Sequence, residues 1–475
     1  MLVLAGCGST VPLANGQSGV STGSGLSARV PSASAQASPA STNAGSLPNG
    51  AQSRTHASVN AGATTASAPS GGIGTTAPSG AVVAADRPVA IGVIGYSNSG
   101  AALSGLGVSG IDTGDNAAEA KAVVRYLNAH GGLDGHQISI AVHLENTESL
   151  IVNDSSEEQA ACTDLTRDHH VFAVVSIAST AIGLGCFAHA HVPMISDAIE
   201  PTIAQERSDD GYYYGPSDIN MDREYQDMVD GLYRGGFFGQ HSKIGVLLWG
   251  PDQEPILNGD IKPALARHGL AVADSFEFGN SAGEDGDAQQ AALRFKTEGI
   301  TNVMEVATSP LFFMESAQNE RYYPAYGLDS GVAPGALLEG NAPAAQLQHT
   351  MAVGWMPTND LDSGHQSDVI SSSQALCRKI QHDAGNSEPA STHPYSDTLC
   401  DELLTLAQSL SNAPGVSVTT LADGYYRLGN SHISAITFES QITPGRPDGI
   451  AAYRLVVYND SCSCFVYRGG KQPMP

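Results

Sequence analysis

Apolar and polar positions follow two different periodicities between residues 87 and 307. Short apolar runs such as RPVAIGVIG (Arg87–Gly95) are typical of buried parallel strands. Segments with apolar residues at i, i+3, i+4 and i+7, such as Asp115–Ala129, predict helices with one buried face, and Asp115 or Asn116 can cap this one. The predicted strands are Arg87–Gly95, Gln137–Leu144, Val171–Ser176, Val192–Ile195, Lys243–Trp249, Val272–Phe276 and Asn302–Ala307; the predicted helices are Asp115–Ala129, Ser155–His169, Gly183–His191, Met221–Phe237, Asp260–His268 and Asp287–Gly299.

The order of these elements predicts the fold class. Strands that alternate with helices of this length imply right-handed crossovers and parallel sheets covered on both faces. A turn-rich break at Tyr212–Asn220 separates two such series. The sequence therefore predicts an α/β protein with two doubly wound parallel-sheet lobes.

The segment before the first strand, residues 8–86, has a different composition. It consists mainly of Ser, Ala, Gly, Thr and Pro, its only charged residues before Ala85 are Arg29 and Arg54, and no aromatic residue precedes Tyr96. Such a segment cannot bury enough apolar surface to offset the entropy of ordering it. We therefore expect a disordered tether. The alternative, a small β domain, lacks the alternating apolar runs that it would need.

Net charge narrows the possible partners. The chain carries −26 overall, and because residues 1–85 contribute +2, the remainder carries −28. This acidity argues against a nucleic-acid partner, which would require clustered Lys and Arg. No run of about 18 apolar residues that could span a membrane occurs. We expect a soluble body outside the cytoplasm.

Three stretches resemble signatures of chemistry, and each has a simpler interpretation. GNSAG (Gly279–Gly283) matches a nucleophile elbow, but an acidic loop follows where a helix should present the Ser. GLGVSG (Gly105–Gly110) matches a dinucleotide fingerprint, but it begins about ten residues after the strand ends. Four histidines suggest a metal cluster, and they are His169, His170, His189 and His191. Their spacing does not enforce a metal site, and the first two are typical of a helix end. We expect no catalytic residues, no cofactor and no metal.

The order of several motifs resembles a known family. YLNAHGGLDGHQISI (Tyr126–Ile140) contains a helix end, two glycines, a further glycine and a strand, and Gly131, Gly132 and Gly135 supply the turns physically. With HVPMISDA (191–198), SKIGVLLWGPD (242–252), EGITNVMEVAT (298–308) and YYPAYGLDSG (322–331), it resembles the type I periplasmic binding proteins, specifically the branched-chain amino-acid group of ABC importers. The resemblance covers essentially all of residues 86–475.

This resemblance implies two lobes built from discontinuous segments and joined by three crossing strands. Lobe 1 would comprise residues 87–216 and 355–426, and lobe 2 residues 217–354 and 427–475. The crossings are expected near Gly215–Ile219, Met351–Pro357 and Ala422–Asn430. Helices at Asp368–Asp383 and Thr398–Ser411 would return to lobe 1, and strands at Ile433–Glu439 and Ala452–Tyr458 would complete lobe 2.

The same resemblance implies a function without chemistry. A ligand that contacts both lobes would stabilise a hinge-closed form. The solute would be small and polar, an amino acid or an amide, and a monomeric protein would deliver it to an ABC permease. The alternative is the same fold used as a ligand sensor or an envelope interaction protein.

Candidate ligand-binding residues follow from the rule that ligands lie beyond the carboxyl ends of strands. The resemblance implies that the loop at Ser179–Thr180 would hold the ligand carboxylate at a helix N-terminus and that Asp329 would pair with the ligand ammonium. Asp197 would repel a bound carboxylate, and Trp249 could form an apolar or cation-binding wall. The full set is Tyr96, Asn98, Ser99, Ala178, Ser179, Thr180, Ser196, Asp197, Ala198, Trp249, Asp252, Gln253, Thr308, Ser309 and Asp329.

The chain has seven cysteines, an odd number. Six of them allow fifteen pairings, and sequence alone does not select one. Within the fold that the resemblance implies, proximity favours three disulfides, and they fit an oxidising compartment. They are Cys162 with Cys186, Cys377 with Cys400, and Cys462 with Cys464.

The remaining cysteine, Cys7, follows Leu4, Ala5 and Gly6 in a pattern that resembles a bacterial lipobox. A lipid on Cys7 and the tether behind it would anchor the protein to the bacterial cell membrane. A complete signal peptide has a basic segment and a longer apolar stretch than these six residues. We therefore expect residues 1–7 to be a truncated signal.

Overall fold

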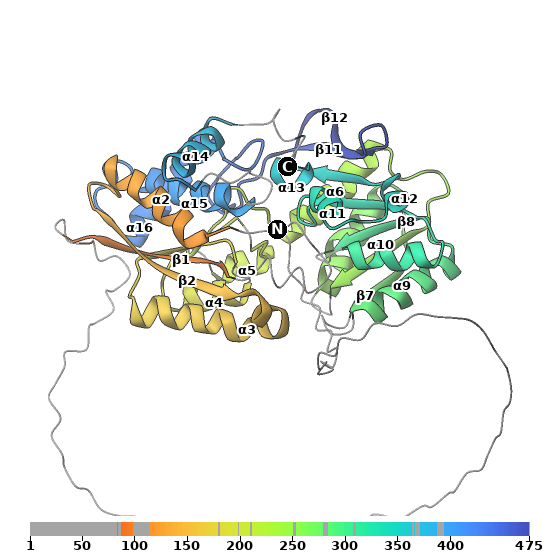
Figure 1. Ribbon diagram of the computed structural model, residues 1–475, viewed down its shortest axis with the longest axis horizontal. Coiled ribbons are helices and arrows are strands. Elements are labelled where there is room, and N and C mark those ends of the chain that lie inside the picture. Colours follow the sequence, from red (N-terminus) through yellow and green to blue (C-terminus); the bar gives the residue numbers. More distant parts are fainter. Residues whose placement is uncertain are drawn as a thin grey trace, which may run out of the picture. The chain divides into compact units, whose positions relative to one another are not determined.

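The computed structural model describes residues 83, 87–97, 114–178, 181–197, 199–209, 211–249, 253–278, 284–306, 310–362, 365, 371–386 and 394–474. All of them belong to one compact unit of the chain. Within it, the backbone forms two separate β-sheets, each with helices packed against it (Figure 1).

The first sheet is entirely parallel, with strand order β2-β1-β3-β4-β5. Helices α3 and α4 contact one another, and so do α2, α14 and α15, which Figure 1 shows on the other side of the strands. The strands are β1 (Val89–Ser97), β2 (Ile138–Asn146), β3 (Ala173–Ser176), β4 (Met194–Ile195) and β5 (Tyr213–Tyr214). The helices are α2 (Asn116–Ala129), α3 (Thr147–Thr163) with a π-helical extension (Asp164–Asp168), α4 (Ala181–His189), α5 (Ile203–Ser208), α14 (Ser372–Asp383), α15 (Pro394–Leu410) and α16 (Val418–Leu428).

The second sheet is mixed, with strand order β12-β11-β10-β9-β8-β6-β7. Five strands are parallel, as expected, and β11 and β12 add an antiparallel edge to this sheet. The strands are β6 (Ile244–Trp249), β7 (Val272–Phe278), β8 (Asn302–Val306), β9 (Ala325–Asp329), β10 (Met351–Gly354), β11 (Ala452–Asn459) and β12 (Cys464–Pro473). The helices are α6 (Met221–Gly235), α7 (Glu254–Ile256), a π-helix (Leu257–Ile261), α8 (Lys262–Arg267), α9 (Glu284–Glu298), α10 (Pro310–Asn319), α11 (Pro334–Glu339), α12 (Ala344–Leu347) and α13 (Pro357–Asp360).

The second sheet is covered on both faces, as the alternation of its side chains shows. Val246 and Leu248 of β6 belong to the apolar core that also contains Met228 and Leu232 of α6. Leu247, between them, belongs to a second core built with α9 and α10. Successive strand side chains point to opposite faces, so each strand serves both cores.

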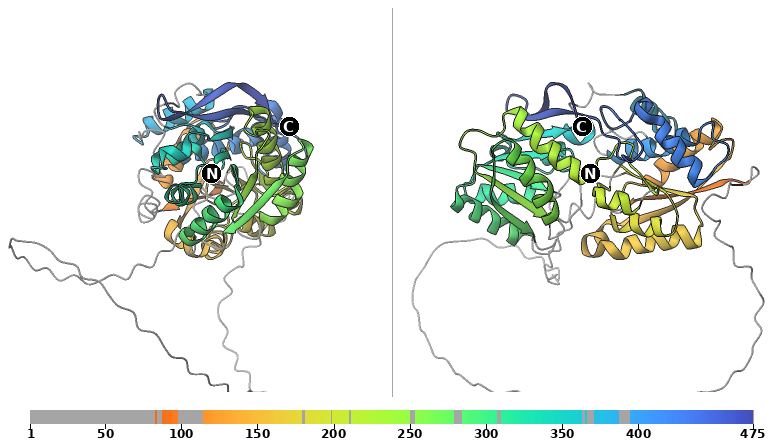
Figure 2. Two further views of the ribbon diagram at one scale, coloured as in Figure 1. Left: turned by 90° about the vertical axis from the view of Figure 1, so that its right-hand side faces the viewer. Right: turned by 180° about the vertical axis from the view of Figure 1, so that it is seen from behind.

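Segments from the C-terminal part of the chain add helices to the first lobe and strands to the second sheet. The helices α14 and α15 contact α2, and Figure 2 shows these blue segments beside the orange one. The strand β11 pairs with β10 in the second sheet. Each lobe is therefore assembled from segments that are far apart in the sequence.

Three expected segments differ from the structure. Met351–Pro357 is not a crossing, since β10 pairs with β9 and β11 inside the second sheet. Ala422–Asn430 is helical, because α16 continues to Leu428 and a 3₁₀ turn follows at Gly429–Ser431. Ile433–Glu439 is not a strand: the N–H groups of residues 435–437 donate to the Asp401 carboxylate and the Ser434 hydroxyl, not to a neighbouring strand.

The connection between the lobes includes two segments that run side by side. Gly215, in the first expected crossing, forms a parallel bridge with Asp448, and its carbonyl accepts from the Gly449 N–H at 2.7 Å. The Asp448 carboxylate forms an ion pair with Arg223 of α6. A β-carbon on Gly449 would lie 2.0 Å from the Pro216 carbonyl oxygen, so the close approach of the two segments requires glycine there.

The structure contains the three expected disulfides. They join Cys162 to Cys186, Cys377 to Cys400, and Cys462 to Cys464. The first connects α3 to α4 and the second connects α14 to α15, so each fastens two helices of the first lobe. None of the described helices has the length and apolarity to cross a membrane.

Candidate functional site

The predicted ligand-binding residues divide into two groups. The first lies outside the described residues: Asn98, Ser99, Ser179, Thr180, Ala198, Asp252, Thr308 and Ser309, together with Cys7 and the GNSAG and GLGVSG stretches. The second is placed by the structure: Tyr96, Ala178, Ser196, Asp197, Trp249 by its backbone, Gln253 and Asp329. Tyr96, Trp249 and Asp329 stand at or next to the carboxyl end of a strand, where the sequence rule expects a ligand.

Three carboxylates meet near Gly331, and we call them the carboxylate cluster: Glu200, Glu224 and Asp329. Gly331 has no side chain, and a β-carbon there would lie 3.0 Å from Glu224 Oε1 and 3.2 Å from both Asp329 Oδ1 and Glu200 Oε1. The three oxygen atoms therefore converge beside the Gly331 Cα atom. Glu200 comes from the first lobe, whereas Glu224 and Asp329 come from the second.

Local structure fixes each member of the carboxylate cluster. Asp329 ends β9, and its Oδ1 accepts from the N–H groups of Gly331 and Val332 at 3.0 and 3.3 Å. Glu224 lies in the first turn of α6, which the Asn220 side chain caps. Glu200 follows β4 with a positive φ of 48°, and its N–H donates to Asp218 Oδ2 at 3.1 Å.

The carboxylate cluster is buried, and its charges repel one another. Glu224 has no exposed surface and Asp329 is 1 % exposed. Burial and the nearby Asp218 and Asp329 raise the pKa of Glu200 to about 8. Burial raises the pKa of Asp329 to about 6, and burial together with Glu200 and Asp329 raises the pKa of Glu224 well above its usual range. Such groups gain a large favourable interaction when a cation enters.

Hydrogen bonding in the carboxylate cluster is incomplete among the described residues. Both oxygens of Glu224 and Oδ2 of Asp329 are buried and have no hydrogen-bond partner there. Asp218, by contrast, accepts from the Tyr213 hydroxyl at 2.5 Å and from the Ile219 N–H at 2.8 Å. The cluster therefore offers acceptors to a donor that the described residues do not supply.

Tyr96 forms a buried aromatic contact in the first lobe. Its ring centroid lies 5.3 Å from that of Tyr395 on α15, and its N–H donates to Asn116 Oδ1 at 2.9 Å. Burial and Tyr395 raise the pKa of the Tyr96 hydroxyl, so it stays protonated. Gln253 is also buried, and its Oε1 has no partner among the described residues.

Asp197 belongs to a polar network that connects segments of the first lobe. Its Oδ1 accepts from the Ser217 N–H at 2.6 Å, and its own N–H donates to Glu402 Oε1 at 3.1 Å. Ser217 in turn donates from Oγ to Asp401 Oδ2 at 2.7 Å. Asp197 therefore ties the loop after β4 to the first crossing and to α15. Ser196 is also engaged, because its hydroxyl donates to a main-chain carbonyl of β3 at 2.6 Å.

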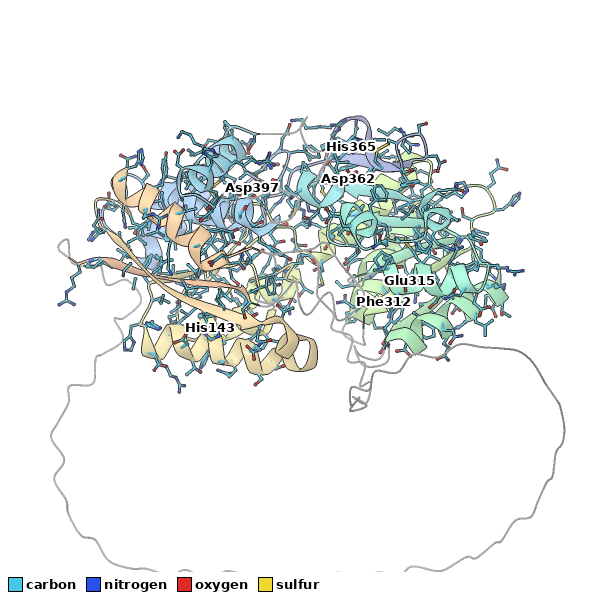
Figure 3. The ribbon with its side chains drawn as sticks, viewed as in Figure 1. His143, Phe312, Glu315, Asp362, His365 and Asp397 are labelled. Atoms are coloured by element: carbon cyan, nitrogen blue, oxygen red, sulfur yellow. A yellow bond between two sulfur atoms is a disulfide. The ribbon has the colours of Figure 1, made fainter. Side chains whose placement is uncertain are left out.

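The histidines and cysteines do not form an available metal site among the described residues. His170 is hydrogen-bonded to Thr166 and His191 to Tyr212, so these two rings face different elements. The ligand atoms of His365, Cys462 and Cys464 lie within 4.8 Å of one another, but the two sulfurs are joined in a disulfide. Figure 3 labels His365 beside Asp362, to which it is hydrogen-bonded at 2.9 Å.

Two members of the carboxylate cluster are not on the list predicted from sequence. Glu200 stands two residues beyond the predicted loop 196–198, and a wider window after the strand would have included it. Glu224 lies at a helix N-terminus, where an acidic residue usually serves the helix dipole. What distinguishes Glu224 from an ordinary acidic residue of a first helical turn is its position opposite Asp329.

Comparisons with known proteins identify the fold. No family model matches the chain, and no curated protein matches it. Among solved structures, a possible leucine/isoleucine/valine-binding protein from Rhodopirellula baltica is 15% identical, with a TM-score of 0.60 over 81% of this chain and 96% of that one.

Two further solved structures agree. The branched-chain amino acid transporter substrate-binding protein from Streptococcus pneumoniae, in complex with isoleucine, is 15% identical, with a TM-score of 0.57 over 82% of this chain and 99% of that one. A leucine-binding protein from Thermotoga maritima is 12% identical, with a TM-score of 0.56 over 80% and 100%. The chain therefore has the fold of the type I periplasmic binding proteins.

Proposed function

We propose that this protein is an extracytoplasmic solute-binding protein that captures a small polar molecule between its two lobes and delivers it to an ABC permease. The carboxylate cluster is the observation that carries the proposal. Glu200 from one lobe and Glu224 and Asp329 from the other approach the same point beside Gly331. A ligand held there contacts both lobes and favours the closed arrangement.

The solved structures of this fold support the proposal. Those from Streptococcus pneumoniae and Thermotoga maritima are described as substrate-binding and leucine-binding proteins. The solute proposed for this chain has an amine or ammonium group, because the buried acceptors of Glu224 and Asp329 require a donor. Ligand capture in this fold needs no covalent chemistry.

A ligand screen tests the capture of a solute. The protein is unfolded in denaturant, dialysed to remove bound solute, refolded, and mixed with pools of amino acids, amines and amides. We expect one pool to decrease the radius of gyration measured by small-angle X-ray scattering and to raise the melting temperature. No change with any pool at millimolar concentration would contradict solute capture.

Delivery to a permease is tested separately from binding. Deletion of the gene from its host should abolish uptake of the radiolabelled solute that the screen identifies. Uptake that persists unchanged, while the purified protein still binds the solute, would favour the sensor alternative.

The proposed anchor is the lipidated Cys7 with residues 8–86 as a tether. Mass spectrometry of the protein isolated from the native envelope should detect diacylglycerol on Cys7. An unmodified thiol would remove the anchor from the proposal and leave solute binding intact.

A further inference from the structure

We propose that the solute carries two positively charged nitrogen groups, as in a short diamine or a dibasic amino acid, and that Glu200 and Glu224 bind the second of them. This inference rests on the proposed function and names the class of solute. One ammonium group is matched by one carboxylate, and Asp329 at the end of β9 provides it. The carboxylate cluster contains two more acidic side chains than that single pair requires.

Among the described residues, the charged groups that act most strongly on Glu200 and Glu224 are acidic. The strongest electrostatic effects on Glu224 come from Glu200, Asp329 and Asp218, and all three are acidic. Arg223, the neighbour of Glu224 in the chain, directs its guanidinium to Asp448 and to the Ile450 carbonyl. The cluster therefore requires positive charge from a bound molecule if its members are to ionise together.

The hydrogen-bonding capacity of Glu224 is an independent observation. This side chain has no exposed surface, and its two carboxylate oxygens have no partner among the described residues. Its Oε1 lies 3.0 Å from the position that a β-carbon on Gly331 would occupy, beside the oxygens of Asp329 and Glu200. A buried carboxylate without donors is unfavourable unless a ligand supplies them. An ammonium group supplies three N–H donors and a guanidinium supplies five.

The three carboxylates that would bind such a group converge beside Gly331. A β-carbon at this residue would lie 3.0–3.2 Å from all three carboxylates, so their oxygens converge on one side of the Gly331 Cα atom. Gly331 is not among the residues with positive φ, so an alanine methyl group fits the backbone there. The Gly331→Ala substitution therefore crowds the three carboxylate oxygens and keeps all three acidic residues in the chain.

Isothermal titration calorimetry on ligand-free protein tests the inference with four probes. 1,4-Diaminobutane and lysine carry two cationic groups, n-butylamine carries one, and calcium chloride supplies a compact divalent ion. We expect at least one of the first two probes to bind at least tenfold more tightly than n-butylamine and than calcium. Lysine binding without 1,4-diaminobutane binding would indicate that the solute also has a carboxylate, and the reverse would indicate a plain diamine.

Variants assign the second cation to its residues. Glu200→Gln and Glu224→Gln should each weaken binding of the dicationic probe at least tenfold, and by a larger factor than they weaken binding of n-butylamine. Gly331→Ala should abolish binding of the dicationic probe. Glu277→Gln, at an exposed position on β7, is the matched control and should change nothing. Circular dichroism of each variant verifies that it is folded.

Failure of this inference is distinguishable from failure of the proposed function. If a neutral or monocationic solute closes the protein and the dicationic probes do not, the solute class is wrong and solute capture stands. Tightest binding of calcium, or equal binding of mono- and dications, would overturn the inference as well. If no probe and no pool from the ligand screen binds, the proposed function itself fails.

Discussion

The substitution Glu200→Gln should stabilise the ligand-free protein at neutral pH while it weakens ligand binding. Burial and neighbouring carboxylates raise the pKa of Glu200 from 4.5 to about 8 in the folded protein. The folded state therefore retains a proton that the unfolded state releases above pH 4.5. The free energy of unfolding falls as pH rises from 4.5 to about 8, and it is unaffected by this group below pH 4.5.

The size of this effect follows from the pKa difference. Each pH unit above the unfolded-state pKa costs about 1.4 kcal/mol, so the cost of Glu200 at pH 7 is on the order of 3 kcal/mol. Gln has nearly the same shape and no ionisation, and it removes this cost. Because Glu224 also retains a proton and the three carboxyl groups interact, part of the cost is shared, and we expect a gain of about 1–3 kcal/mol at pH 7 and about zero at pH 4.5.

Urea unfolding of refolded, ligand-free protein at pH 4.5 and 7 measures this difference. Trp355 is 2 % exposed, so its fluorescence reports unfolding. Glu277→Gln, on the surface of β7, is the control and should shift neither midpoint. Equal midpoints for wild type and Glu200→Gln at pH 7, or a shift of the same size at both pH values, would refute the reasoning.

Three further predictions concern the framework. Gly424→Ala should destabilise the protein by about 3 kcal/mol, because the new β-carbon would lie 1.6 Å from the Ser409 carbonyl oxygen; an unchanged melting temperature would contradict the α15–α16 packing. Gly185→Ala, inside α4 where a β-carbon meets nothing within 4 Å, should stabilise by about 0.5–1 kcal/mol in urea unfolding, and a loss would show a contact that this geometry excludes. Replacing Cys377 and Cys400 by Ala should cost about 3 kcal/mol, because their disulfide links residues 23 positions apart; stability equal to that of the oxidised wild type would contradict this.

The alternation of strands and helices was predictable because it depends on local periodicity. Asp115 caps α2 as the sequence suggests, since its side chain accepts from the Ala118 N–H at 2.9 Å. Asp329 was predictable as well, because the end of a parallel strand is where ligands bind. The structural roles of Asp115 and Asp329 follow from the residues next to them in the sequence.

Other elements depend on contacts that no local pattern contains. The alternating residues of Ile433–Glu439 suggest a strand, but the Ala435 N–H donates a hydrogen bond to the Asp401 carboxylate on α15 at 2.6 Å. The family resemblance predicts a crossing strand at Ala422–Asn430, whereas Ser417 and Thr420 form a capping box that begins the helix α16. In this second case the local capping signal predicts the helix that the structure contains.

The role of Glu224 in the site could not be predicted from the sequence. Its sequence context is an ordinary acidic first turn, and its significance arises only when α6 is placed beside β9 and the loop after β4. A pairing across three elements has no periodic signature.

The position of the C-terminal segments has a consequence for the order of folding during synthesis. The strands β11 and β12 extend the second sheet, α14 and α15 cover α2, and Asp448 pairs with Arg223. During synthesis, the early part of each lobe therefore exposes apolar surface until the C-terminal segments have left the ribosome. Exposed apolar surface of this kind is what chaperones bind during synthesis.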